Sequence, residues 1–488
     1  MNSKPKLVRG LTLWPATALN MVDMIGVGPF ITLPLMVAAM GGARAIYGWV
    51  AGALLAMADG LIWAELGAAM PRAGGSYEYL QEIYGRRKLG RLLAFLFVFQ
   101  LVFSAPVSMA TGCIGLASYA SYLFPALSKV LWHGALQFHF LGPVNLPIVI
   151  SGATLLACSA ALTATFLVYR RIGAIGRISK RLSAGVLAAV GFVIFLGLTH
   201  FHAATAFPHG WSSLAPDGGF WTGFSAGLLF ALYDYWGYYN ICFLGEEVVA
   251  PHRTIPRSML LSIACVGVLY VLMNLGIVGA LPAGTLTAMA QGSGQNFAAA
   301  SAAQAVYGSW AGIVVSVLVI WTAFASVFSL LAGYSRIPFA AARDGNFFRI
   351  FETVDEKGNF PKYSVLLLGG LAAVLSIFQL KDLLGALVII RILLLFLVQA
   401  AGAALWRFRD PAYPRPFRMW LFPLPVLITV AGFLLVLHDR EALLARAAVF
   451  TAIGVAIFLA RAWRSREWPF RSHVKTSELA RVPVGSAN

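Results

Sequence analysis

Long apolar segments recur along the chain from one end to the other. Each is near the ~20 residues that an α-helix needs to cross ~30 Å of hydrocarbon. The alternating segments of roughly 10 residues that are typical of a membrane β-barrel do not recur. The pattern therefore predicts an all-α integral membrane protein with twelve transmembrane helices, at residues 12–39, 44–70, 91–124, 146–168, 183–200, 220–244, 257–281, 309–334, 363–380, 383–406, 419–437 and 443–463.

The composition excludes several other classes of protein. Of the 488 residues, 59% are hydrophobic and only 11% are charged, whereas a soluble globular protein carries about 25% charged residues. This balance argues against a soluble enzyme, a disordered protein and a nucleic-acid-binding module. The formal net charge of +17 comes from basic residues between apolar segments, where such residues orient a membrane protein.

The basic residues also predict the orientation of the chain. If the N-terminus is placed inside the cell and the sides then alternate, thirty of the 36 lysine and arginine residues lie on the inner side. Under the positive-inside rule, both termini are expected in the cytoplasm, at 1–11 and 464–488, in a multi-pass protein of the cell membrane. Arg391 lies within a span, and five basic residues lie outside: Arg44, Lys129, Lys381, Arg440 and Arg446.

The first span contains residues that interrupt a helix. Gly26, Gly28 and Pro29 lie in its middle, and Asp23 precedes them by one turn. Proline removes a backbone donor and glycine lowers the cost of unwinding. An unwound segment at membrane depth normally lines a cavity within the protein. We therefore expect a break here, with a kinked but continuous helix as the alternative.

The sixth span carries a similar signal. Asp234 stands in its middle, and aromatic residues surround Gly237. An intramembrane carboxylate usually marks a transport pathway or a proton relay. Aromatic residues alone could form an interfacial belt, but the mid-span position and the adjacent acid favour the wall of a cavity.

The positions of these two spans predict an inverted repeat. If spans 1–5 and 6–10 are repeats, each crosses the membrane an odd number of times, so the second is upside down relative to the first. Corresponding interrupted helices in inverted halves indicate the binding site of a secondary transporter. The chain would then comprise a first repeat at 12–200, a second repeat at 220–406 and two further helices at 419–463.

Several motifs resemble those of the amino acid–polyamine–organocation (APC) transporter superfamily over roughly residues 10–410. The segment at residues 64–79, Ala-Glu-Leu-Gly-Ala-Ala-Met-Pro-Arg-Ala-Gly-Gly-Ser-Tyr-Glu-Tyr, is the most specific match. The other matches are Gly26-Val-Gly28-Pro-Phe30, Tyr233-Asp-Tyr-Trp236, Glu246-Glu247 with Pro251 and Thr254-Ile-Pro-Arg257, and Ser335-Arg336 with Ala341-Ala-Arg-Asp-Gly345.

The resemblance implies a leucine-transporter-type fold, with a five-plus-five inverted-repeat core, discontinuous helices 1 and 6, and alternating access. It implies that Trp236 belongs to a gate and that the substrates are amino acids or their amine products. It also implies two groups of substrate-binding residues. The carboxylate would bind backbone at Ile25, Gly26, Val27 and Gly28, and the α-amino group would bind backbone at Tyr233, Asp234 and Tyr235, with Gly237 supplying flexibility.

Intramembrane acids are candidates for substrate binding or coupling. Asp23 and Asp234 each precede the break in their helix, so they could share one cavity and there bind a cationic amine or take up a proton. Alternatively, each is a polar ligand of the unwound backbone. In span 2, Glu65 is expected to make a structural or gating contact, and Asp59 to pair with a basic group.

Three further residues are coupling or gating candidates. Arg391 in span 10 must pair or line water, so it could neutralise Asp23 or Asp59, or it could snorkel. Ser326 and Ser329 lie on one face of span 8. Hydroxyls there join the ion site in sodium-coupled relatives of the resembled fold, although serines that bond to their own helix are commoner.

The sequence gives no sign of a metal or a cofactor. The spacing of the eight histidines matches no metal template, and the four cysteines form no CxxC motif. Gly173-Ala-Ile-Gly176 before Arg177 lacks the strand–helix context of a phosphate-binding loop. We therefore expect no cofactor.

The most economical hypothesis is a secondary transporter of amino acids that is proton-coupled or exchanging, with sodium as the alternative ion. A polyamine or organic-cation transporter on the same fold is the second hypothesis. A membrane enzyme would need a catalytic constellation at one depth, and a channel would need a continuous polar stripe; the sequence shows neither. The expected partners are the substrate, the coupling ion and the lipid bilayer, in a monomer or weak homo-oligomer that binds no nucleic acid.

Overall fold

The computed structural model describes residues 7–139, 143–291, 297–355, 358–378, 388–438 and 440–470. Most of the predicted C-terminal tail, the first six residues and the expected start of span 10 at 383–387 lie outside these ranges. In the first half of the chain the helices are α1 (Leu13–Met24), α2 (Gly28–Met40), α3 (Ala45–Ala69), α4 (Ser76–Tyr84), α5 (Leu89–Leu123), α6 (Gly152–Val168), α7 (Ile172–Thr199), α8 (Ala203–Ala206), α9 (Phe220–Tyr235) and α10 (Asn240–Phe243).

The second half continues the same helical arrangement. The span-10 helix, Val388–Arg409, contains a π-helical segment at Ile392–Leu397 and ends as α18 (Val398–Arg409). The remaining helices are α11 (Pro251–Ala280), α12 (Ala283–Gln291), α13 (Ala298–Tyr307), α14 (Ser309–Tyr334), α15 (Arg336–Arg343), α16 (Lys362–Leu375), α19 (Leu424–Leu437) and α20 (Glu441–Arg464).

The prediction of a helical membrane protein is confirmed in its coarse form. Within the described ranges, seven helices are long and apolar enough to span a membrane, and the bent pair α1–α2 is an eighth candidate. The helices α6, α16 and α19 are apolar but shorter. The count of twelve spans stays a prediction.

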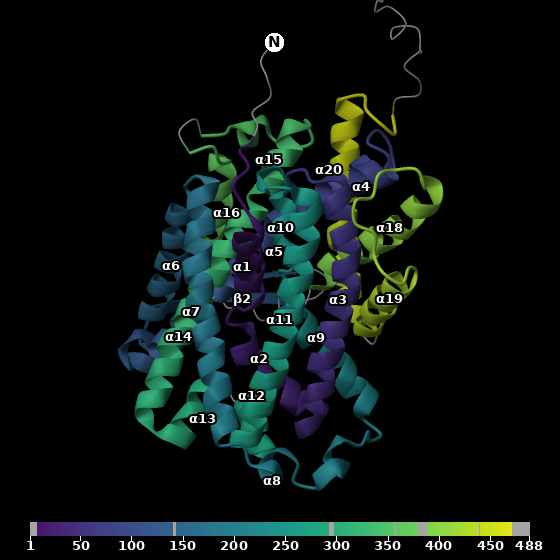
Figure 1. The fold of residues 1–488 in the computed structure, drawn as a ribbon. Helices are drawn as coiled ribbons and strands as arrows, with labels where there is room; N and C mark the ends of the chain where they lie inside the picture. Colours follow the sequence, from purple (N-terminus) through teal and green to yellow (C-terminus); the bar gives the residue numbers. More distant parts are fainter. Residues whose placement is uncertain are drawn as a thin grey trace, which may run out of the picture.

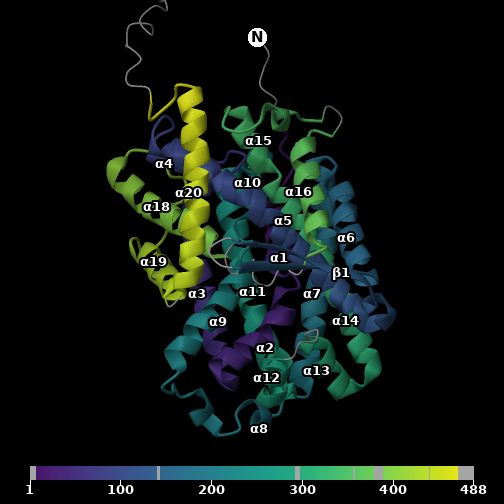
Figure 2. The same cartoon turned by 180° about the vertical axis from the view of Figure 1, so that it is seen from behind.

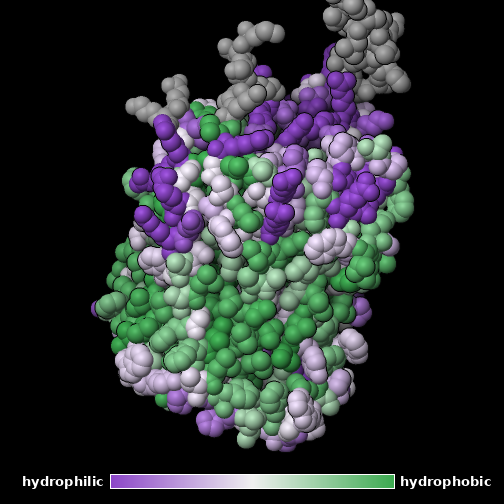
Figure 3. Space-filling model, viewed as in Figure 1, coloured by the Kyte–Doolittle hydropathy of each residue, from purple (hydrophilic) through white to green (hydrophobic). Residues whose placement is uncertain are grey.

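The exterior has two distinct zones. In Figure 3, apolar residues cover most of the visible side of the molecule, and hydrophilic residues gather at one end. That end carries α4 and α15, and α20 finishes there (Figures 1 and 2). A broad apolar belt with a polar cap is the arrangement expected of a protein that crosses a bilayer.

One part of the fold differs from the all-α expectation. Strands β1 (Val130–His139) and β2 (Pro143–Ser151) form an antiparallel two-stranded sheet, so α6 begins at Gly152 and not at 146. Residues 147–150 read Pro-Ile-Val-Ile, and proline and β-branched residues favour strand over helix. The Ser151 side chain then accepts a hydrogen bond from the Thr154 N–H at 3.2 Å, which caps α6. A short apolar run alone does not distinguish these alternatives.

The broken helices lie at the centre of the molecule. α1 packs against α7, α11 and α14, and its lower continuation α2 packs against α9. α3 lies against both α9 and α11, and α5 lies against α14. Figure 1 shows α1 and α10 enclosed by these longer helices. The fold therefore brings the interrupted segments into the interior, away from the apolar exterior.

Candidate functional site

The first span is broken between α1 and α2, as predicted. The two helices are bent by 46° at a short break that follows Met24. Pro29 stands in the first turn of α2, where a helix needs no N–H donor. The hydroxyl of Tyr270, on α11, lies 2.7 Å from the carbonyl oxygen of Met24 and 3.2 Å from that of Asp234. One tyrosine therefore reaches exposed carbonyls at both interrupted spans.

The sixth span is also broken, between α9 and α10. Gly237 lies in this break with a φ angle of 123°, a left-handed conformation that glycine adopts without a steric penalty. A Cβ added to Gly237 would lie 2.8 Å from the backbone nitrogen of Met24 and 2.9 Å from Cβ of Asp23. The two breaks therefore lie directly against one another, and this contact leaves no room for a side chain.

A cavity of about 60 Å³ lies beside the two breaks. Its walls come from both broken spans, from α5 and α14, and from the span-10 helix. Of the predicted site residues, Ile25, Tyr235, Asp59, Glu65 and Ser329 do not line it. Those that do are Asp23, Gly26, Val27, Gly28, Tyr233, Asp234, Trp236, Gly237, Ser326 and Arg391.

The cavity wall contains buried polar atoms that have no hydrogen-bond partner within the described part of the chain. One oxygen of the Asp234 carboxylate accepts the Thr32 hydroxyl, and its other oxygen has no partner. The same is true of Oδ2 of Asp23 and of Nε1 of Trp236. Buried polar atoms in native proteins nearly always have partners, so the free atoms indicate a site that is completed by a bound group.

Arg391 supplies a positive charge in the same cavity. Its Nη2 donates to the hydroxyls of Ser104 at 3.1 Å and Ser108 at 3.4 Å, both on α5. Its guanidinium lies 5.3 Å from the Trp236 ring centroid and 5.8 Å from that of Tyr334. Among the described residues it forms no direct ion pair with Asp23 or Asp59, but its positive charge acts on the nearby Asp23 carboxylate, so neutralisation of Asp23 by Arg391 stays a prediction. The hydroxyl groups and aromatic faces hold the guanidinium.

Span 2 uses its two acids outside this cavity. Asp59 is buried and accepts a hydrogen bond from the Tyr238 hydroxyl in the second break, and not the basic group that was expected. Glu65 accepts Nε of Arg407 at 2.8 Å and the N–H of Met419 at 2.7 Å. Glu65 thus links α3 to α18 and to the chain that follows α18, and whether this contact is structural or gating stays a prediction.

The two serines of α14 differ in their surroundings. Ser326 lines the cavity, and a Cβ added to Gly26 would lie 2.9 Å from its hydroxyl oxygen. Ser329 donates to the Leu19 carbonyl at 2.7 Å and accepts from the Asn240 side chain at 3.1 Å. Ser329 therefore joins α14 to α1 and α10, and it does not bond only to its own helix.

Ion pairs and backbone bonds close the end of the molecule at which α1 begins. The N–H of Gly10 donates to the Glu247 carbonyl at 2.8 Å. The fully buried Glu247 carboxylate accepts Nε of Arg336 at 2.8 Å, and Glu246 accepts Nη1 of Arg343 at 2.9 Å. Two stretches that carry the sequence resemblance, one after span 6 and one after span 8, thus meet in space.

Several contributors to the site could not be found from the sequence. Thr32 and Tyr270 look like ordinary residues of apolar spans, and Ser104 and Ser108 gain significance only through Arg391. Asn20 could have been identified from the sequence as a contact residue, because it is a polar amide deep in an apolar span. Its Oδ1 accepts the N–H of Ile241 at 3.0 Å and so links α1 to α10.

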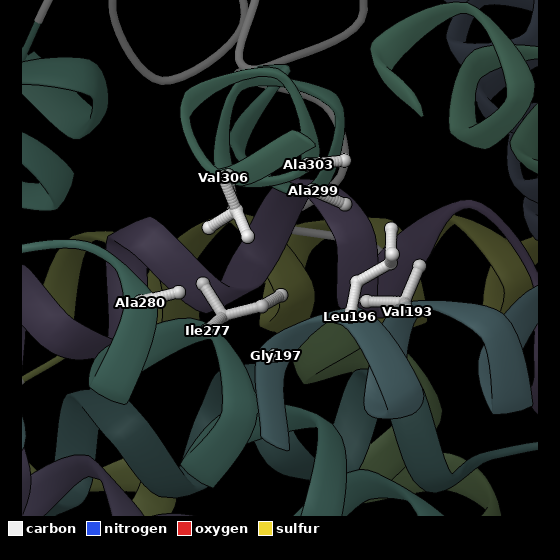
Figure 4. Close-up of a pocket in the computed structure, with 9 residues that line it drawn as sticks. Val193, Leu196, Gly197, Ile277, Ala280, Ala299, Ala303 and Val306 are labelled. Carbon is white, nitrogen blue, oxygen red and sulfur yellow. The ribbon is translucent and has the colours of Figure 1, made fainter. Parts of the chain in front are cut away.

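Within the described part of the chain, the histidines, the cysteines and the apolar interior contribute no further site. No cluster of three His, Cys, Asp or Glu side chains in the described ranges could hold a metal ion, and all four cysteines are free. A small cavity between α7, α11 and α13 has a volume of about 10 Å³. Its lining residues, drawn in Figure 4, are all apolar: Val193, Leu196, Gly197, Ile277, Ala280, Ala299, Ala302, Ala303 and Val306.

Comparison with known proteins gives consistent relatives. A protein family described as "Amino acid permease" matches residues 11–458. The serine/threonine exchanger SteT of Bacillus subtilis is 25% identical over 86% of this chain and 89% of its own length. The branched-chain amino acid permease BcaP of the same organism is 23% identical over 94% of both chains. The mouse cationic amino acid transporter 4 is 26% identical over 84% of this chain and 61% of its own length.

Proposed function

Given that the chain belongs to the amino acid permease family of the APC superfamily, we propose that it is a secondary active transporter that moves amino acids across the cell membrane by alternating access. The supporting observation is the contact of the two broken spans at Gly237, beside a cavity with unpartnered carboxylate oxygens. The family is one of transporters and not of enzymes.

The packing of the helices supports the proposed inverted repeat of five plus five spans, followed by two further helices. A two-fold relation between the halves exchanges span 1 with span 6 and span 2 with span 7. The contact of α3 with α9 then corresponds to the contact of α11 with α1, and both are present. Likewise, α5 packs against α16 and α14 packs against α6. Paired contacts of this kind are expected when two halves share one fold in opposite orientations.

The cavity suits a solute that carries both charges. We assign the ammonium group of the substrate to Asp23, whose Oδ2 has no partner among the described residues and is free to accept a hydrogen bond, and the coupling proton to Asp234. The substrate carboxylate is assigned to the backbone at residues 25–28, the start of α2, where the helix dipole favours an anion. Trp236 is assigned to a gate, because it lies in the second break, lines the cavity and stacks on Phe396 at 5.0 Å between ring centroids.

The two carboxylates also suit proton coupling. Asp234 lies beside Gly28 at the start of α2, so closely that a Cβ on Gly28 would overlap its carboxylate. An ionised Asp234 therefore competes with a substrate carboxylate for the same helix terminus. Protonation of Asp234 removes that competition, which couples proton uptake to substrate binding.

A second candidate is a transporter of polyamines or other organic cations. Two acids at one cavity would hold a substrate with two amino groups, and one relative is named a cationic amino acid transporter. Arg391 in the same cavity opposes a doubly cationic substrate, because the like charges repel. We therefore prefer a zwitterionic amino acid.

The orientation proposed for the chain has both termini in the cytoplasm. The start of α1 and the end of α20 lie at the same polar end of the molecule (Figures 1 and 3). In this orientation the bonds of Gly10 and Arg336 to Glu247 close the cytoplasmic side. These contacts must part when the site opens inward.

A ligand panel distinguishes the two substrate classes. A ligand that binds only the folded protein raises its thermal stability in proportion to RT ln(1 + [L]/Kd). We expect zwitterionic amino acids to stabilise the detergent-solubilised protein and diamines to have no effect. Stabilisation by diamines alone would select the second candidate, and stabilisation by neither would remove both.

The variant Asp234→Asn tests the proposed coupling. An amide side chain cannot take up or release the coupling proton. In proteoliposomes we therefore expect uptake by the wild type to increase with an inward-directed proton gradient, and uptake by this variant to lose that increase. Glu441→Gln, an exposed change at the start of α20, is the matched control and should transport normally. Uptake that ignores the proton gradient would exclude proton coupling, and unchanged uptake by Asp234→Asn would remove this residue from the mechanism.

A further inference from the structure

A second polar cavity lies at the polar end of the molecule, and its lining shares no residue with the cavity beside the broken helices. Its volume is about 880 Å³. Three separate segments contribute to its lining: residues 8–10 before α1, residues 169–174 and Arg177 where α7 follows α6, and Asp355 with residues 358–360 before α16. The cavity therefore forms only in the folded protein. It could not be predicted from a sequence motif, because the segment from Gly173 to Arg177 lacks the strand–helix context of a phosphate-binding loop.

The cavity is strongly basic. Four exposed arginines line it, namely Arg9, Arg170, Arg171 and Arg177. Asp355 is the acidic residue in its described lining, and that carboxylate accepts the N–H of Gly358 at 2.6 Å within its own loop. The sequence contains no acidic residue between Glu82 and Asp217. A concentration of positive charge in a concave site favours a multiply charged anion.

The start of α7 contributes backbone donors to the same cavity. Ile172 and Gly173 belong to the first turn of this long helix and line the cavity. The first N–H groups of a helix have no partner within the helix, and its dipole favours a negative charge there. Gly10 packs closely on this turn, since a Cβ added to Gly10 would lie 3.6 Å from the backbone nitrogen of Gly173.

We propose that this cavity binds a phosphate group. Arginine side chains bind phosphate oxygens in a bidentate manner, and the helix start adds backbone N–H donors. The geometry favours the headgroup of an anionic phospholipid as the source. Arg170 lies 5.3 Å from the ring centroid of Phe166, and Phe166 is 66% exposed on the apolar outer face of α6. The site therefore borders the surface that lipid would cover.

Binding at this site would act on the N-terminal segment. Arg9 adjoins Gly10 and Leu11, whose N–H groups both donate to the Glu247 carbonyl. A phosphate group held by Arg9 and by the arginines around the start of α7 fastens this segment to α7. Bound phosphate then stabilises the conformation in which this end of the molecule is closed.

The test uses the full-length protein in a neutral detergent and three soluble probes: dihexanoyl phosphatidylglycerol, dihexanoyl phosphatidylcholine and inorganic phosphate. Thermal stabilisation is measured as each probe is titrated. We expect phosphatidylglycerol to stabilise the wild type and phosphatidylcholine to have no effect. In Arg170→Gln/Arg177→Gln, the apparent affinity for phosphatidylglycerol should fall about tenfold or more, because each arginine near an anionic headgroup strengthens binding several-fold.

The matched control is Lys180→Gln/Arg181→Gln, which removes the same amount of charge from α7 outside the cavity. It should bind phosphatidylglycerol as the wild type does. Arg9→Gln, which lies before the first helix, gives a second test that leaves α6 and α7 intact, and it should weaken binding several-fold. Stabilisation by inorganic phosphate with no further gain from phosphatidylglycerol would support the phosphate site and assign it to a soluble ligand. Equal losses in both double variants, or no stabilisation by either phosphate probe, would overturn the proposal.

Discussion

The two breaks lie against each other, but they consist of different types of residue. The first break consists of small and aliphatic residues, and Tyr270 on a neighbouring helix donates to the Met24 carbonyl at its edge. The second break consists largely of aromatic residues that pack outward on neighbouring helices. Tyr239 stacks on Trp63 at 4.6 Å between centroids, and Trp236 stacks on Phe396.

This difference shows how the chain keeps unwound backbone stable at membrane depth. At the first break, a side chain from a neighbouring helix donates to a buried carbonyl that has no partner within the helix, so the break itself can remain narrow. At the second break, the aromatic rings hold the unwound segment in place and form one wall of the cavity. The packing groups and the cavity-lining groups are therefore side chains of the break itself. Substitutions at the first break should therefore act through added volume or lost bonds, and those at the second through backbone strain and ring contacts.

The largest effect is expected for Gly237→Ala. Alanine at a φ of 123° is strained, and its Cβ would overlap the backbone at Met24. The two costs together amount to about 3 kcal/mol. We expect a markedly lower thermal midpoint and loss of uptake in proteoliposomes. The control is Gly191→Ala in α7, where no atom lies within 4 Å of the added Cβ and alanine should be neutral or stabilising. Equal behaviour of the two variants would show that the breaks are not in contact.

A smaller loss of stability is expected for Gly28→Ala. The added Cβ overlaps the Asp234 carboxylate, which is the end of a side chain and can move aside. We expect a cost of about 1–2 kcal/mol but a much larger loss of uptake, because the displaced carboxylate loses its bond to Thr32. The thermal midpoint of the variant, measured with and without an amino acid, separates the loss of stability from the loss of substrate binding. Normal uptake would show that the position of Asp234 at α2 has no role in transport.

The sequence predicts both breaks because their causes are local. Glycine and proline at 26–29 and the acid at 234 each change the energetics of their own segment, whatever surrounds it. The partners of Arg391 could not be predicted from the sequence, because Ser104 and Ser108 lie far from it along the chain and resemble ordinary helix residues. The strand at 143–151 was missed because hydropathy records burial and not backbone conformation.

An intermediate effect on stability is expected for Tyr270→Phe. The ring remains, but the hydroxyl that lies between the two breaks is lost. The Asp234 carbonyl loses this donor, whereas the Met24 carbonyl still accepts the N–H of Gly26 at 3.1 Å. Leaving a buried acceptor without its partner costs about 1–2 kcal/mol. The control is Tyr307→Phe, whose hydroxyl bonds to Thr199 at an exposed site and should change the midpoint little. If both tyrosine variants have the same thermal midpoint, the hydroxyl of Tyr270 between the two breaks does not contribute to the free energy of unfolding.

The smallest effect is expected for Ser329→Ala. Its hydroxyl donates to Leu19 and accepts from Asn240, but the Asn240 side chain also donates to the Ser329 carbonyl at 2.9 Å and keeps that bond in the variant. The net loss should therefore be about 1 kcal/mol. Ser316→Ala is the control, because the Ser316 hydroxyl bonds only to the Gly312 carbonyl of its own helix, and it should be neutral. Uptake by Ser329→Ala should show the same ion requirement as the wild type. If the variant instead needs more sodium for the same uptake, Ser329 is an ion ligand, and its bond to α1 is not its main contribution.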